Sequence, residues 1–214
     1  KNLKENHGAL IINGDDTKSG IIFTQNVGGN KGCFNISQDL NKTFNHEVRY
    51  FSGSMPKLLA NRSDKEFSEY KRNALIDFKK NTYSLIVATK SFGMGVNKPN
   101  IHFTIHYGIP SSMEALYQEG GRAGRDKVIF NKDNPAKCIS LLSQSSRIEL
   151  EGLWGTDLSV DNLKKKKLSG DLDTNLFLMK SSLENEQEEF ERIKNIFDLF
   201  TKSTETLVTL KGKS

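Results

Sequence analysis

The nine residues from Gln118 to Asp126 combine side chains that could bind phosphate. The segment reads QEGGRAGRD and holds one glutamine, two arginines and three glycines. A guanidinium group donates forked hydrogen bonds that match the oxygens of a phosphate. Glycine costs about 1 kcal/mol inside a helix relative to alanine, so three glycines within five residues indicate that another backbone or a ligand comes close. Spacing alone leaves two interpretations open, a phosphate-binding face or a glycine-rich surface turn with solvated arginines.

The residues before this segment predict the start of a helix that would position its side chains. A serine pair at 111–112 precedes an apolar-periodic run at 113–116, as helix caps often do. If the helix continues, Gln118, Arg122 and Arg125 stand at i, i+4 and i+7 and share one face. Two arginines on that face would meet something planar and anionic.

Two predicted strands end in polar residues that could contact a ligand. Residues 84–89 form the clearest buried strand, and Lys90, Ser91 and two glycines follow it. Backbone amides and hydroxyls in such a segment can approach phosphate oxygens. Residues 20–24 form another apolar strand, with Thr24 at its end and a polar, glycine-rich loop behind it. Ligands gather outside the carboxyl ends of strands in open α/β sheets, so this loop either touches a ligand or is a plain connection.

The chain alternates strand and helix about five times between residues 20 and 143. Further strands are expected at 48–51, 101–107 and 138–142, and helices at 35–44 and 65–79. This alternation is typical of an α/β fold with a doubly wound parallel sheet flanked by helices. After about residue 145 the pattern predicts a mostly helical appendage, with an amphipathic helix at 184–200. We therefore divide the chain into a lead-in segment (1–18), a sheet domain (19–145) and the appendage (146–214).

The composition permits a nucleic-acid partner and excludes several other classes. The 214 residues carry 31 Lys+Arg against 26 Asp+Glu, a net charge of +5, which allows such a partner without requiring one. No apolar run approaches the ~18 residues of a membrane span, so we expect no membrane association. Cys33 and Cys138 stand far apart without a CxxC pair, which indicates reduced cysteines, an intracellular protein and no zinc site of four cysteines. The four lysines at 164–167 favour a solvated loop, with phosphate contact as the alternative.

Two segments together resemble motifs V and VI of superfamily-two helicases, and more narrowly the RecQ branch. Residues 87–99 read VATKSFGMGVNKP, beside the family pattern VAT-x-AFGMG-[IV]-DKP. Residues 116–126 read LYQEGGRAGRD, beside YYQE-x-GRAGRD. The strand at 20–24 matches motif IV, and residues 50–53 stand where the family has YHAG. The resemblance covers about residues 19–145 and implies the second RecA-like lobe of an ATP-dependent 3′–5′ DNA helicase.

The resemblance implies a nucleotide-facing role for the arginine segment. ATP and Mg²⁺ would bind in a cleft between two lobes, mainly on an N-terminal RecA-like lobe that this sequence lacks. Arg125 would be the arginine finger on the γ-phosphate, a type of contact that typically supplies ~10³–10⁵ in rate. Arg122 would be a second phosphate contact, and Gln118 would link the ATP state to lobe closure. Asn97 takes the place of a family aspartate, which puts any ribose or arginine-pairing role of that position in doubt.

The resemblance also implies contacts to single-stranded or forked DNA. Thr89, Lys90 and Ser91 of motif V would hold phosphates of the nucleic-acid strand. Ser52, Gly53 and Thr24 would add further contacts to that strand. The protein would work in the cytoplasm of a bacterium or the nucleus of a eukaryote, with the N-terminal lobe as its partner. We expect this chain alone to be inactive, because G-x-x-x-x-G-K-[ST] and DE-x-H are missing and its start without Met indicates a piece of a longer helicase.

Two other functions stay open at this point. The lobe could belong to an RNA helicase, although the details of both motifs favour RecQ. A non-enzymatic nucleic-acid-binding module with the same fold is the other alternative. The intact Arg122 and Arg125 argue against that module, because a scaffold has no use for the pair.

Overall fold

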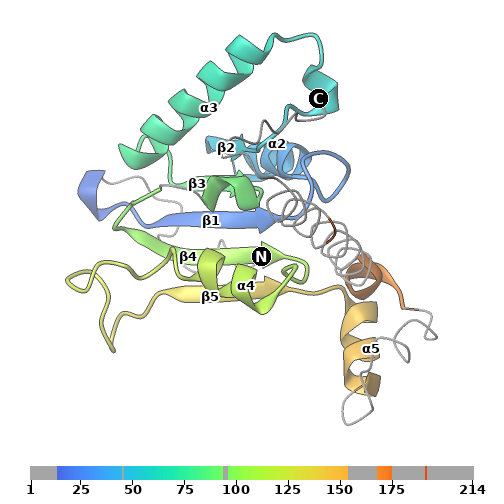
Figure 1. Ribbon diagram of the computed structural model, residues 1–214. Coiled ribbons are helices and arrows are strands. Elements are labelled where there is room, and N and C mark those ends of the chain that lie inside the picture. Colours follow the sequence, from blue (N-terminus) through green and yellow to red (C-terminus); the bar gives the residue numbers. More distant parts are fainter. Residues whose placement is uncertain (1–13, 45, 94–95, 154–167, 175–190, 192–214) are drawn as a thin grey trace, which may run out of the picture.

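One parallel sheet organises the molecule (Figure 1). The computed structural model describes residues 14–44, 46–93, 96–153, 168–174 and 191. Its strands lie in the order β2-β3-β1-β4-β5, with bounds Ser19–Thr24 (β1), Val48–Phe51 (β2), Leu85–Ala88 (β3), Ile101–Tyr107 (β4) and Lys137–Leu141 (β5). The helices are Cys33–Phe44 (α2), Asp64–Lys79 (α3), Met113–Gly120 (α4) and Gln144–Leu153 (α5), with short 3-10 turns at Gly14–Asp16 (η1), Lys57–Leu59 (η2) and Lys90–Gly93 (η3). The predicted doubly wound α/β sheet flanked by helices is confirmed.

Each face of the sheet has its own core, because successive strand residues point to opposite faces. Ile21 and Phe23 of β1 pack on one face with Phe92 of η3. Ile22, between them, packs on the other face with Cys33 at the start of α2. The connection after β1 therefore covers one face, whereas η3 and α4 lie on the opposite face (Figure 1).

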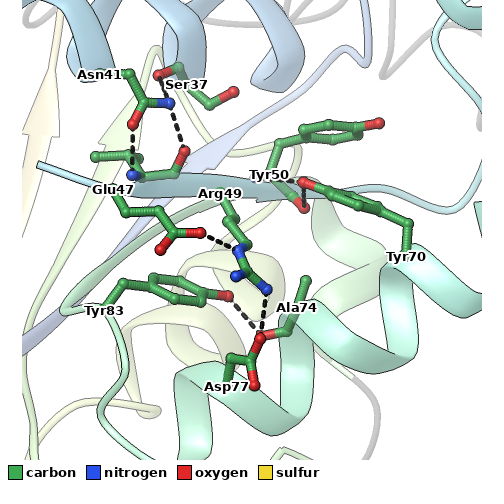
Figure 2. A network of polar contacts seen from close by, with 10 residues as sticks. Ser37, Asn41, Glu47, Arg49, Tyr50, Tyr70, Ala74, Asp77 and Tyr83 are labelled. Atoms are coloured by element: carbon green, nitrogen blue, oxygen red, sulfur yellow. Dashed lines mark hydrogen bonds and ion pairs between the residues drawn. The ribbon is translucent and has the colours of Figure 1, made fainter.

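A polar network holds β2, an edge strand, to α3 (Figure 2). Arg49 of β2 donates to Glu47 Oε1 at 2.5 Å and to Asp77 Oδ2 of α3 at 2.6 Å. Burial opposes the charge of Arg49, but the two carboxylates outweigh it and raise the arginine's pKa. The hydroxyl of Tyr70 on α3 accepts from the backbone N–H of Tyr50 at 3.3 Å and donates to its carbonyl at 3.2 Å. Arg49 thus stabilises the fold through ion pairs within the protein.

The amino ends of the strands are fastened by a second network, around Lys98. The Lys98 side chain is 1% exposed, and its ammonium group donates to Asn81 Oδ1. Asn100 Nδ2 donates to the same oxygen at 3.0 Å and to the carbonyl of Thr17 at 2.6 Å. Burial lowers the pKa of Lys98 to about 8. This lysine, although it stands in the segment that resembles motif V, is therefore part of the interior.

The described part of the appendage packs against the carboxyl ends of the strands. Asp171, 9% exposed, accepts from Lys31 Nζ at 3.0 Å and from the backbone N–H of Ser143 at 2.7 Å. The four lysines at 164–167 and the helix predicted at 184–200 lie outside the described residues, except for residue 191. The division at residues 18/19 and 145/146 stays a prediction. No helix in the described part of the chain is long and apolar enough to cross a membrane.

Candidate nucleotide and nucleic-acid site

Residues 121–126 of the arginine segment form a turn, called the arginine turn below, and do not continue helix α4. α4 ends at Gly120, so the prediction that Gln118, Arg122 and Arg125 share a helical face is wrong. Gly124 has φ +72°, a left-handed conformation that glycine adopts at low cost and that no α-helix contains. The backbone N–H of Gly124 donates to the carbonyl of Ile101, the first residue of β4, at 3.1 Å. The turn therefore lies near the amino end of the sheet.

The glycines of this segment make room for the protein's own chain. A Cβ atom on Gly120 would lie 3.0 Å from the sulfur of Cys138 on β5. A Cβ atom on Gly124 would lie 2.9 Å from that of Ala136, just before β5. The predicted close approach therefore exists, and in the structure it joins α4 and the arginine turn to β5.

The turn holds two arginines whose charges act on each other. Arg122 is 8% exposed, and burial followed by the charge of Arg125 lowers its pKa, while Glu119 opposes that shift. Arg125 is exposed, and its Nε donates to the carbonyl of Gly121 at 3.1 Å. Gln118 is also exposed and donates to Glu114 Oε1, one turn earlier, at 2.7 Å. Two like charges in one turn repel each other, and an anion placed between them would relieve that repulsion.

The hydroxyls expected to contact nucleic acid are mostly buried at the carboxyl ends of the strands. Thr24, 5% exposed, donates to the carbonyl of Asn26 at 3.0 Å, and the fully buried Ser52 donates to that of Ser54 at 2.7 Å. Thr89 Oγ1 lies 2.8 Å from Ser91 Oγ. These hydroxyl groups therefore hold the loops at this edge of the sheet by hydrogen bonds within the protein.

Of the residues predicted to contact nucleic acid, Gly53 and Lys90 are exposed. A Cβ atom on Gly53 would lie 3.3 Å from that of Ser91, so the ends of β2 and β3 meet there. Sequence reasoning therefore placed these residues at one edge, and of their side chains Lys90 is the one that faces solvent.

A crevice of about 150 Å³ opens between the carboxyl ends of β1 and β4. Connections leave these neighbouring strands toward opposite faces, which is the switch point where open α/β sheets bind ligands. The lining includes Thr24, Lys90, His106 and Glu119. Sequence reasoning missed His106 and Glu119. A histidine in an apolar strand is usually a core residue, and the glutamate carried no signal of its own beside the two arginines.

The two predicted sets of residues therefore lie at opposite ends of the sheet. Thr24, Ser52 and Thr89 follow strand carboxyl ends, whereas the turn around Gly124 reaches the start of β4. Asn97 is exposed and precedes the buried Lys98 network, so it belongs to the amino end as well. α4 connects the two ends.

Comparisons with known proteins agree on one family. The family described as "Helicase conserved C-terminal domain" matches residues 4–127. The ATP-dependent DNA helicase hus2/rqh1 of Schizosaccharomyces pombe is 31% identical over 67% of this chain and 9% of its own length. The ATP-dependent DNA helicase RecQ of Haemophilus influenzae is 46% identical over 29% of this chain and 9% of its own length. The chain thus spans about a tenth of the length of these relatives.

Two further matches come from proteins that act on RNA by name or title. A putative ATP-dependent RNA helicase, R290, of Acanthamoeba polyphaga mimivirus is 49% identical over 28% of this chain and 11% of its own length. The solved structure of Mss116p DEAD-box helicase domain 2 bound to an RNA duplex is 17% identical, with a TM-score of 0.47, over 72% of this chain and 50% of that one.

Proposed function

Because the chain belongs to the family of helicase conserved C-terminal domains, we propose that it is the second RecA-like lobe of an ATP-dependent 3′–5′ DNA helicase of RecQ type. The RecQ-like resemblance of the sequence is confirmed by relatives named ATP-dependent DNA helicases. The roles of individual residues, the substrate and the N-terminal lobe are part of the proposal.

The paired guanidinium groups of Arg122 and Arg125 carry the nucleotide part of this proposal. Burial and then the charge of Arg125 disfavour the charged form of Arg122, and polyphosphate oxygens would offset the repulsion between the two arginines. Arg125 is exposed, and its Nε bond to Gly121 orients the guanidinium from within the turn. Phosphoryl transfer needs positioning and charge neutralisation more than covalent catalysis. The pair therefore fits ATP, with Arg125 as finger and Arg122 as second contact; Mg²⁺ would be held mainly by the other lobe.

The carboxyl ends of the strands carry the nucleic-acid part. Lys90 is exposed at the end of β3, beside the crevice and Gly53. A strand held there through its phosphates would be bound without sequence preference and with strong salt dependence. DNA is favoured because two of the relatives are named DNA helicases, and RNA is the second candidate because one relative is named a putative RNA helicase.

The test is ATP turnover by the protein that carries both lobes, without nucleic acid, with single-stranded DNA and with RNA. Arg125→Ala should lower kcat by about 10³-fold or more, while nucleotide binding, followed by fluorescence of a labelled ATP analogue, survives. Arg72→Ala is the matched control, because Arg72 is an exposed arginine of α3 whose Nη2 lies 4.0 Å from Oε1 of Glu69. Normal turnover in Arg125→Ala would exclude the finger role, and stimulation by RNA alone would replace DNA as the substrate.

A further inference from the structure

A buried histidine–glutamate pair joins β4 to the last turn of α4. His106 is 2% exposed, and its Nδ1 lies 3.0 Å from Oε2 of Glu119. The imidazole ring also stacks on Phe23 of β1, with ring centroids 5.6 Å apart. A buried ion pair or charged hydrogen bond is weak evidence for stability, since apolar side chains of similar volume often serve the fold as well. The pair therefore calls for a functional explanation.

Glu119 stands between the crevice and the arginine turn. Helical side chains tilt toward the helix N-terminus, so Glu119 reaches back to the carboxyl half of β4 and lines the crevice with Lys90. On its other side, its main-chain carbonyl accepts from the backbone N–H of Arg122 at 3.3 Å. The Glu119 carboxylate also attracts the Arg122 guanidinium, and it partly offsets the lowering of that group's pKa by burial and by Arg125. One residue is thus in contact with both ends of the candidate site.

We propose that His106 and Glu119 are positioning residues that couple a nucleic-acid strand in the crevice to the placement of Arg122. This inference rests on the proposed function. His106 fixes the Glu119 carboxylate, and Glu119 fixes the last turn of α4, from which the arginine turn starts. A strand in the crevice lies against this pair and limits its movement, so strand binding and arginine placement stabilise the same arrangement. Such coupling between two sites typically amounts to about 5- to 150-fold.

Substitutions at residue 106 separate positioning from packing. His106→Leu removes the donor to Glu119 and keeps an apolar side chain of similar volume. His106→Asn keeps an N–H donor close to the position of Nδ1. His102→Leu is the matched control, because His102 is also a histidine of β4 and its ring nitrogen bonds a backbone carbonyl, that of Asn100, at 2.9 Å.

The experiment measures kcat and KM for ATP in the protein with both lobes, with and without a single-stranded dT oligonucleotide. Thermal unfolding and the Kd of the oligonucleotide in the absence of nucleotide accompany each variant. We expect His106→Leu to lower the DNA-stimulated kcat by about 5- to 150-fold, with the Kd and the unfolding temperature close to wild type. His106→Asn should recover most of that kcat, and His102→Leu should keep it.

Three outcomes would overturn the inference. Full stimulation in His106→Leu would show that the pair does not act on Arg122. A kcat that falls equally in the Leu and Asn variants, in step with the unfolding temperature, would make the pair structural. If no single-stranded nucleic acid stimulates the wild-type protein, the proposed function fails first, and the coupling fails with it.

Discussion

The buried ammonium group of Lys98 allows a quantitative test of how the amino end of the sheet is held. Nζ of Lys98 donates to Asn81 Oδ1 and lies 5.0 Å from the ring centroid of Phe78. Asn81 Oδ1 also accepts from Asn100 at 3.0 Å, so it keeps a partner when the ammonium group is removed. We expect Lys98→Met to stabilise the protein at pH 7, because burial penalises the charged form of this lysine.

The size of the effect follows from the pKa of Lys98, which burial lowers from 10.5 to about 8. Between these values the unfolded chain binds more protons than the folded one, so the free energy of unfolding of the wild type rises as the pH rises through about 8. At 1.36 kcal/mol per pH unit, the charge costs at most about 3 kcal/mol at pH 7. By about pH 9.5 the wild type should regain about 2 kcal/mol of this cost. Met does not titrate, so Lys98→Met should regain none.

Urea unfolding followed by circular dichroism, at pH 7 and at about pH 9.5, measures both proteins. The difference between them isolates Lys98, because other groups such as Cys33, whose pKa burial raises to about 11, titrate in both. The stability advantage of Lys98→Met should shrink by about 2 kcal/mol between the two pH values. If the stability advantage of Lys98→Met over the wild type does not change with pH, the argument from a buried charge on Lys98 is refuted. A variant less stable than wild type at pH 7 would show that the contacts to Asn81 and Phe78 outweigh desolvation.

Three further predictions concern single residues. Gly124→Ala should destabilise the chain by about 1–2 kcal/mol or more in urea unfolding, because its φ is +72° and Ala136 is close, whereas Gly28→Ala, with open space around it, should change stability little. Lys90→Ala should lower the slope of log K against log salt for single-stranded DNA by about one, and an unchanged slope would remove Lys90 from the track. Burial opposes the charge of Asp171, but bonds from Ser143 and Lys31 outweigh it and lower its pKa below 3.8. Its contribution to stability is therefore present above about pH 4 and lost in more acid solution, so Asp171→Asn should weaken the acid dependence of unfolding.

The sheet could be predicted because buried parallel strands are written as continuous apolar runs. The runs at 20–24 and 84–89 became β1 and β3, shifted by one residue at most. Helix α3 was predicted from apolar spacing, and its start is fixed by a local signal. Ser63 Oγ accepts from the backbone N–H of Glu66, and Glu66 Oε2 accepts from that of Ser63. Such features depend on residues close together in the chain.

The end of α4 could not be predicted for the opposite reason. Its spacing is helical through Arg125, and what ends the helix at Gly120 involves residues distant in sequence. Gly124 bonds Ile101, and Gly120 packs against Cys138 of β5. The contact between His106 and Glu119 could not be predicted from the sequence either. The two residues are thirteen positions apart, one on a strand and one on a helix, so no periodic pattern relates them.

The close packing of α4 has a consequence for how the proposed lobe would work. The helix has eight residues, which corresponds to about 12 Å, and it leads from the carboxyl end of β4 to the arginine turn. A long side chain at residue 120 or 124 would lie between α4 and β5. It could adopt several rotamers there, which would loosen the contact. The glycines instead bring α4 and the turn against Cys138 and Ala136. An event at the crevice would then shift α4 as a unit, and the arginines with it. If the proposed function holds, the glycines of the segment keep α4 and the arginine turn tightly packed on β5, so that they move together. The arginines are then the residues of the segment that face the nucleotide.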